Sequence, residues 1–297
     1  MAAIDVQAPD EIGELLAPYL PGETSASAAR LEQLSREILA TEGYFSPQIE
    51  ADGAPEALQL RIDPGAQSIV RSLDIRIDGP LVAKAKADLI AGWGLPVGRA
   101  FRQNDWNDAK QAILGALLAD RHAAARLVDS QAEINPEAHS ADLQAHYDAG
   151  PPYRFGELRI TGLKRYTPEL IARYNRDVIP GEPYSQARLG ALQNTLQATP
   201  YFSSVQVDIE PDTPPDADGE ISAPVKLRVR ERAPHRVAFG VGASSNTGAR
   251  VEANYHTPDL FNQAWEFDTG LRLEQKKQTA YSDVFFPPDG KERRHSV

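Results

Sequence analysis

Hydrophobic residues change their spacing in a regular order between residues 153 and 235. Residues 153–161, with Phe155, Leu158 and Ile160 among their apolar residues, are expected to form a strand. Residues 205–209 and 225–229 alternate apolar and polar side chains, and this spacing predicts two half-buried strands. Between the first two strands, Leu189, Leu192 and Leu196 recur at helical spacing. An earlier helix is expected from Thr167-Pro168-Glu169, which combines a hydroxyl cap, a proline in the first turn and an early acid. The predicted order is therefore strand, helix, helix, strand, strand.

The same order recurs twice earlier in the chain. In the first copy, helices are expected around residues 12–19 and 31–38 and strands near 45–51 and 57–62. In the second copy, strands are expected near 68–78, 126–134 and 141–147, with helices near 80–92 and 103–119. Each copy has about 80 residues. The sequence therefore predicts an α+β chain of three tandem βααββ units, at residues 1–66, 67–152 and 153–235.

Short turn motifs support this division. Pro21-Gly22-Glu23 recurs as Pro180-Gly181-Glu182, and Asp63-Pro64-Gly65 resembles Asp148-Ala149-Gly150. Gly98 and Gly181 are each followed three residues later by an aromatic residue. Each match is weak alone, but their common order favours a true repeat.

The last 62 residues, 236–297, follow a different pattern. Trp265, Phe267, Leu271 and Leu273 lie on one face of a ten-residue alternating stretch whose other face is polar. Two shorter alternating stretches precede it, and turn residues near 245–248 separate them. Such segments suit the strands of a transmembrane β-barrel, although an edge hairpin of a soluble sheet fits them equally well. Because a barrel needs about eight strands, these residues would form only its beginning.

Charge and composition narrow the function classes. The 297 residues carry a net charge of −11, and residues 1–66 alone hold 12 acidic against 3 basic side chains. An acidic chain argues against nucleic-acid binding. No apolar run reaches the roughly 18 residues of a membrane helix. The first residues, Met1 to Asp5, lack the basic and apolar regions of a signal peptide, so none is expected within this chain.

No catalytic or cofactor motif is found. The chain has no cysteine, and its six histidines show no paired metal-binding spacing. No nucleophile elbow or phosphate-binding loop occurs. The acidic stretch from Asp212 to Glu220 departs from the spacing of a calcium loop and is expected to be a solvated hairpin loop. The sequence therefore predicts a protein that is not an enzyme and needs no cofactor or metal.

The three βααββ units resemble POTRA (polypeptide-transport-associated) domains. The run Phe239-Gly240-Val241-Gly242, with the Thr247-Gly248 turn after it, resembles the first barrel strand of the outer-membrane assembly and surface-antigen superfamily. Within it, the unit count resembles the TamA family, which provides the outer-membrane subunit of the translocation and assembly module. The resemblance implies POTRA domains in the periplasm and a barrel in the outer membrane. It also implies unfolded outer-membrane or autotransporter clients, outer-membrane lipid and a TamB-like inner-membrane-anchored partner.

Three candidate sites follow from this resemblance and from the residue patterns. The exposed edge strand that would receive clients carries over to Val205, Gln206, Val207, Asp208 and Ile209. Pro47 is expected to weaken such binding in the first unit. An acidic face for partner docking comprises Glu11, Glu14, Glu32 and Glu37, and a lipid face comprises Trp265, Phe267, Leu271 and Leu273. An alternative is a two-partner-secretion-type transporter or a lipid-handling envelope scaffold, in which the units only dock a partner.

Overall fold

The computed structural model describes residues 4–20, 27–54, 57–210, 213–244, 248–261 and 263–287. The Pro21-Gly22-Glu23 link, the turn residues 245–247, Met1 and Asp212 lie outside the described residues. The chain divides into two compact units, one formed by Met1–Leu118 with Ala124–Gly150 and the other by Ala119–Ala123 with Pro151–Val297. No helix in the described part of the chain is long and apolar enough to cross a membrane.

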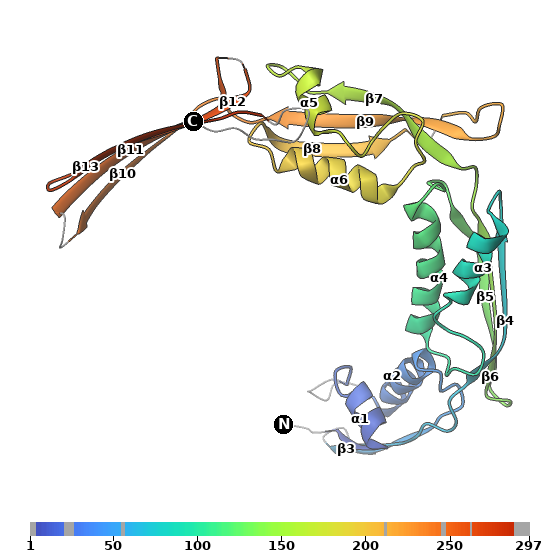
Figure 1. The fold of residues 1–297 in the computed structure, drawn as a ribbon. Helices are drawn as coiled ribbons and strands as arrows, with labels where there is room; N and C mark the ends of the chain where they lie inside the picture. Colours follow the sequence, from blue (N-terminus) through green and yellow to red (C-terminus); the bar gives the residue numbers. More distant parts are fainter. Residues whose placement is uncertain are drawn as a thin grey trace. The chain divides into compact units, whose positions relative to one another are not determined.

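Three three-stranded sheets, each with two helices, confirm the predicted α+β class (Figure 1). In each sheet the first strand pairs in parallel with the last, which is central, and the middle strand of the sequence forms an antiparallel edge. The strand orders are β1-β3-β2, β4-β6-β5 and β7-β9-β8.

The elements follow the sequence pattern closely. The first copy contains β1 (Asp5–Gln7), α1 (Asp10–Leu16), α2 (Ala28–Thr41), β2 (Gln48–Ala54) and β3 (Ala57–Asp63). The second contains β4 (Ile69–Asp78), α3 (Ala83–Ala91), α4 (Gln103–Ala119), β5 (Arg126–Asn135) and β6 (Ser140–Asp148). The third contains β7 (Tyr153–Thr161), α5 (Pro168–Tyr174), α6 (Gln186–Gln197), β8 (Phe202–Ile209) and β9 (Ile221–Glu231).

Two details differ from the prediction in the first copy. Helix α1 ends at Leu16, and the side chain of Tyr19 beyond it is 58% exposed instead of joining the core. Strand β2 begins at Gln48, so Pro47 precedes the strand and removes no donor from it. The expected weakening by Pro47 therefore loses its structural basis.

The turn motifs have matching geometry in different copies. Gly98 and Gly181 both adopt positive φ angles, of 87° and 88°, which L-residues with side chains rarely adopt. The N–H of Gly98 donates to Val70 O, and the N–H of Gly181 donates to Phe155 O in the same way. Three residues later, the buried aromatics Phe101 and Tyr184 close these turns. The glycine-to-aromatic spacing therefore marks one structural turn used twice.

Each copy has its own buried apolar core between sheet and helices. In the third copy, helix α6 contributes Leu189, Leu192 and Leu196, as the sequence pattern predicted. Strands β8 and β9 contribute alternate residues, such as Val205 and Leu227. This packing covers one face of the sheet and leaves the polar residues of β8 and β9 on the other.

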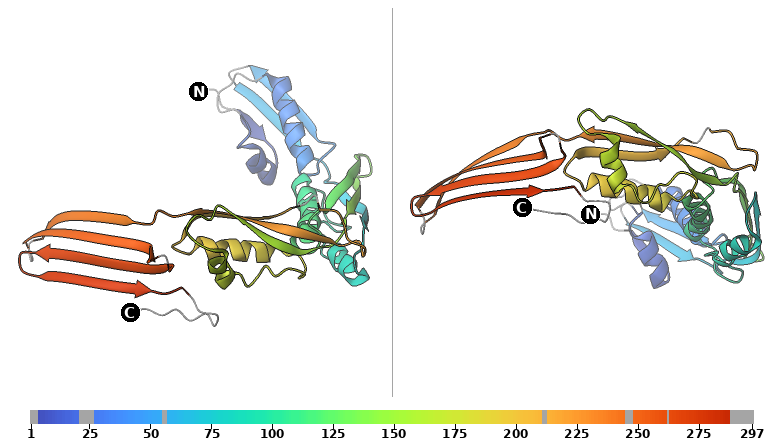
Figure 2. Two further views of the ribbon diagram at one scale, coloured as in Figure 1. Left: turned by 90° about the horizontal axis from the view of Figure 1, so that it is seen from above. Right: turned by 45° about the horizontal axis from the view of Figure 1, so that its top comes forward.

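A separate antiparallel sheet follows the third copy. Its strands are β10 (Arg236–Ser244), β11 (Gly248–Leu260), β12 (Trp265–Glu274) and β13 (Gln278–Phe285), and they lie side by side in sequence order (Figure 2). Tyr201, at the start of the third copy's edge-strand region, donates its hydroxyl to the main-chain oxygen of Ala264 at 2.9 Å. The β11–β12 loop is thus bonded to the third copy.

Candidate functional site

Strand β8 is an edge strand, as the sequence predicted, because β9 pairs with it on one side only. Val205 and Val207 are 5% and 7% exposed and point into the core, whereas Gln206 and Asp208 are exposed. Ile209 is half-buried. The two valines of β8 therefore lie in the core, and the outer backbone groups of the strand lie along the edge of the sheet.

Two outward N–H groups of β8 are bonded to side chains of helix α6. The N–H of Val205 donates to Gln197 Oε1 at 2.9 Å, and the N–H of Val207 donates to Gln193 Oε1 at 3.1 Å. Gln197 Nε2 also lies 3.4 Å from the main-chain oxygen of Ser203. The sequence analysis did not identify these glutamines, although their i, i+4 spacing on one helix was visible.

The exposed face of β8 and β9 carries ion pairs. Asp208 lies 2.8 Å from Arg228, and Glu210 lies 2.9 Å from Lys226 and 2.8 Å from Arg159. The hydrogen bond from Lys226 is the main cause that lowers the pKa of Glu210 below its ordinary value. Acidic residues alternate with apolar ones along β8, and basic residues do so along β9. These ion pairs therefore join the acidic face of one strand to the basic face of the next.

The four acidic residues assigned to partner docking are not equivalent. Glu11, Glu14 and Glu37 are exposed on α1 and α2. Glu32 is half-buried instead, and its Oε1 accepts the N–H of Ala51 on β2 at 2.9 Å. Glu37 accepts a bond from Gln33 at 2.8 Å, on the exposed face of α2. Three of the four carboxylates are thus exposed to solvent, whereas Glu32 accepts a backbone N–H of the edge strand β2.

The register of the last sheet places the predicted lipid-face residues together. Leu273 lies opposite Val251, and Leu271 lies opposite Ala253, while Trp265 and Phe267 continue the same face of β12. On β10, Phe239 and Val241 are 81% and 86% exposed. One face of this sheet is therefore broadly apolar and open in the structure.

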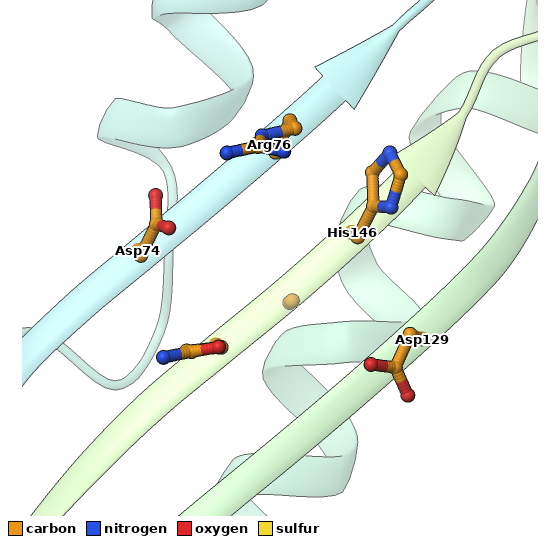
Figure 3. Close-up of a pocket in the computed structure, with 6 residues that line it drawn as sticks. Asp74, Arg76, Asp129 and His146 are labelled. Carbon is orange, nitrogen blue, oxygen red and sulfur yellow. The ribbon is translucent and has the colours of Figure 1, made fainter.

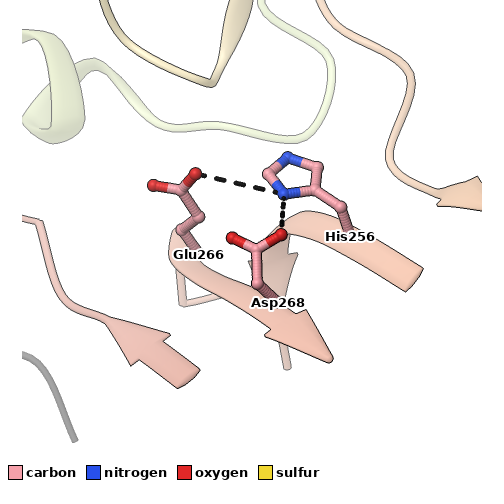
Figure 4. A group of neighbouring side chains, drawn as sticks. All are labelled: His256, Glu266 and Asp268. Carbon is pink, nitrogen blue, oxygen red and sulfur yellow. Dashed lines mark hydrogen bonds and ion pairs between the residues drawn. The ribbon is translucent and has the colours of Figure 1, made fainter. Parts of the chain in front are cut away.

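The opposite face of the sheet is polar. His256 of β11 lies directly opposite Asp268 of β12, and its Nδ1 lies 2.8 Å from Asp268 Oδ1 and 4.0 Å from Glu266 Oε1 (Figure 4). These three side chains could hold a divalent ion, since their ligand atoms lie within 4.8 Å of one another. The direct hydrogen bond between His256 Nδ1 and Asp268 Oδ1 also gives both side chains a partner without an ion. Sequence spacing alone missed this group because cross-strand pairing creates it.

A polar hollow of about 200 Å³ lies on the sheet of the second copy. Figure 3 shows Asp74 and Arg76 on β4, His146 on β6 and Asp129 on β5 around it. His146 Nε2 lies 2.7 Å from Asp78 Oδ2, within hydrogen-bonding distance on the same face of the sheet. Its charged residues are those of an exposed sheet face.

Comparison with known proteins identifies the third copy. Residues 153–232 match the POTRA family, described as surface antigen variable number repeat. BamA from Haemophilus ducreyi lacking POTRA domains 1–3 superposes with a TM-score of 0.60 at 18% identity, over 74% of this chain and 40% of that one. The chain thus spans less than half of that BamA structure. The likeness to BamA shows a shared fold, and the third copy is similar to POTRA domains in sequence.

Other solved structures cover similar shares of the chain. POTRA domains 3–5 of BamA from Haemophilus influenzae align over 78% of this chain and 96% of that one, at 18% identity and a TM-score of 0.46. CdiB from Acinetobacter baumannii aligns over 75% of this chain and 42% of that one, at 13% identity and a TM-score of 0.41.

Proposed function

We propose that this chain is the periplasmic arm, with the first barrel strands, of an outer-membrane assembly factor of the TamA type. In this role its POTRA units receive unfolded outer-membrane or autotransporter clients and pass them to a barrel that begins near β10. The function is binding and handover, without a catalytic step. The POTRA match of the third copy and the BamA-like fold support the proposal.

The observation that carries it is that β8 pairs with β9 on one side only, so that no described strand covers its outer side. A client in extended conformation would pair its backbone with the outward groups of β8 as an added strand, which makes little demand on its sequence. Such binding suits a factor that handles many different clients. The apolar face of β10–β13, with Phe239 and Val241 strongly exposed, would meet outer-membrane lipid. The acidic first unit would meet a TamB-like inner-membrane-anchored partner.

A proline in place of Val207 tests client capture. The Val207 N–H faces away from β9, so Val207→Pro removes an outward donor without removing a β8–β9 hydrogen bond. We expect the full chain with this change to bind a synthetic peptide of the sequence of residues 265–274 about two- to tenfold more weakly. Fluorescence anisotropy of the labelled peptide measures this, and circular dichroism checks the fold.

Three variants control for side-chain effects. Val207→Ala removes core volume but keeps the N–H, and Gln206→Ala and Asp208→Ala change only exposed side chains. We expect all three to bind nearly as well as the unchanged protein. Equal binding by Val207→Pro would discard strand addition at β8. If a TamB-like partner still bound while no peptide did, a transporter or lipid-handling scaffold that only docks a partner would be favoured.

A further inference from the structure

We propose that the side chains of Gln193 and Gln197 occupy the hydrogen-bonding positions that a client strand would take on β8. Client binding would then replace these two carboxamides with backbone groups of the client. This inference rests on the proposed function, because it concerns the same edge. It adds that the edge is occupied before a client arrives, and it names the residues that a client must displace.

The hydrogen bonds show the substitution atom by atom. Gln197 Oε1 accepts the N–H of Val205 at 2.9 Å, while its Nε2 lies 3.4 Å from the main-chain oxygen of Ser203. A carboxamide offers one acceptor and a donor, as a peptide group does. Gln197 therefore bonds to β8 as one residue of a neighbouring parallel strand would, because such a residue directs both its N–H and its C=O to the same side. Gln193 Oε1 accepts the next outward N–H, that of Val207, at 3.1 Å.

The spacing of helix and strand makes this two-point contact possible. Residues four apart in a helix are displaced by about 6 Å along its axis. Residues two apart in a strand, whose N–H groups face the same side, are displaced by about 6.7 Å. The later glutamine meets the earlier valine, so α6 runs antiparallel to β8. Two glutamines at i, i+4 thus match two successive outward donors.

In the other copies, the second helix contacts its edge strand through different chemistry. In the first copy, Glu32 of α2 accepts one N–H, from Ala51 on β2, and a carboxylate has no N–H to donate. In the second copy, Lys110 of α4 lies 3.4 Å from Ser130 Oγ on β5, and an ammonium group cannot accept a backbone N–H. The paired carboxamides are therefore a feature of the third copy.

The arrangement leaves the glutamines displaceable. Gln197 is exposed and Gln193 is half-buried, and both sit on long, flexible side chains. A client strand would replace both bonds and add others, whereas a ligand without a backbone donor and acceptor in register would not. The same glutamines also accept outward N–H groups of β8 that could otherwise pair with unrelated strands. Capture would then be weaker and more easily reversed than at a bare edge.

The double variant Gln193→Ala/Gln197→Ala tests the exchange in the full chain. Alanine favours the helix, so α6 should remain intact. Without any client, we expect the amide hydrogens of Val205 and Val207 to exchange about tenfold faster by NMR. We also expect the peptide of the sequence of residues 265–274 to bind about three- to tenfold more tightly, because nothing competes for these donors.

Two further variants sharpen the comparison. Gln186→Ala removes an exposed glutamine from the start of the same helix and should change neither readout. Gln193→Glu/Gln197→Glu retains the acceptor oxygens and should keep the slow exchange that the alanine variant loses.

The outcomes separate this inference from the proposed function. If the amide hydrogens of Val205 and Val207 exchanged at an unchanged rate in the alanine variant, the proposal that a client displaces the glutamines would be overturned. This would hold even if Val207→Pro still weakened peptide binding. Peptide binding that the alanine variant leaves unchanged or weakens would overturn it as well. If amide exchange were faster in the alanine variant but neither this variant nor the unchanged protein bound the peptide, the glutamine contacts would be supported and client capture at β8 would be rejected.

Discussion

The carboxylate of Glu231, at the end of β9, lies 3.2 Å from Arg165 Nε, in the segment between β7 and α5. It also accepts the main-chain N–H groups of Lys164, Arg165 and Tyr166, at 2.7 to 3.1 Å. The Glu231 side chain is only 7% exposed. A single buried carboxylate thus fixes the approach to helix α5 against the last strand of the third unit.

We expect Glu231→Gln to lower the free energy of unfolding of the third unit by about 2 kcal/mol. Burial opposes ionisation of Glu231, but the three backbone hydrogen bonds and Arg165 outweigh it and lower its pKa. Because the folded pKa lies below the unfolded value near 4.3, the stabilisation is present above about pH 4.3 and is lost as pH falls below it. Urea unfolding at pH 7 and pH 3 measures this difference.

Glu157→Gln is the matched control, because Glu157 is exposed on β7 of the same unit. This variant should unfold as the unchanged protein does. If Glu231→Gln were equally destabilising at both pH values, the ionised carboxylate would not be the source of the stabilisation.

The bond from Tyr201 to Ala264 predicts a second stability effect, one without pH dependence. Tyr201 is 2% exposed, and burial raises its pKa above the ordinary value of 10.0, so its hydroxyl remains a donor throughout the neutral range. Tyr201→Phe leaves the main-chain oxygen of Ala264 without this partner. We expect a loss of about 1–2 kcal/mol at both pH 6 and pH 8.

Thermal unfolding by circular dichroism checks this effect. Tyr19→Phe serves as the control, because the Tyr19 side chain is 58% exposed. A melting temperature unchanged by Tyr201→Phe would show that the hydrogen bond adds nothing to the contact between the β11–β12 loop and the third unit.

The fold was largely predictable from the sequence because the local pattern and the packing agree. The predicted strand 153–161 coincides with β7, and the three leucines of α6 are buried as their spacing implied. The glutamine contacts with β8 were not predictable, because they depend on where α6 crosses the sheet. Element ends are harder to predict, as Pro47 shows. The strand was expected near residues 45–51 but begins at Gln48, so Pro47 lies outside it.

The apolar face of β10–β13 predicts association in water. Because Phe239 and Val241 are largely exposed, we expect the full chain to self-associate or to require detergent. A chain ending at residue 235 should remain dispersed. Static light scattering with and without detergent measures both. Phe239→Ser/Val241→Ser should reduce association, whereas Ala238→Ser, on the opposite face of β10, should not.

A full chain that stays monomeric in water would contradict the prediction that this apolar face meets lipid. Aggregation of the chain ending at residue 235 would contradict it as well, because the apolar surface responsible would then lie in the three βααββ units.

The charge of the first unit predicts salt-dependent docking of a TamB-like partner. Glu11, Glu14 and Glu37 are exposed, so their charges would attract a basic surface as it approaches. Between about 50 and 500 mM salt, the Debye length falls from above 10 Å to about 4 Å, and association should slow markedly. Neutralising these three residues with glutamine should lower the association rate more than it raises the dissociation rate.

Glu32 provides the control within the same surface. Glu32→Gln removes its charge but retains an oxygen that can accept the N–H of Ala51, so strand β2 should be undisturbed. Because Glu32 is half-buried, we expect this single change to slow association less than Glu37→Gln does. Surface plasmon resonance at several salt concentrations separates the two rates. An association rate that responds neither to salt nor to the triple change would remove the electrostatic role, and the acidity of the first unit would then serve only its solvation.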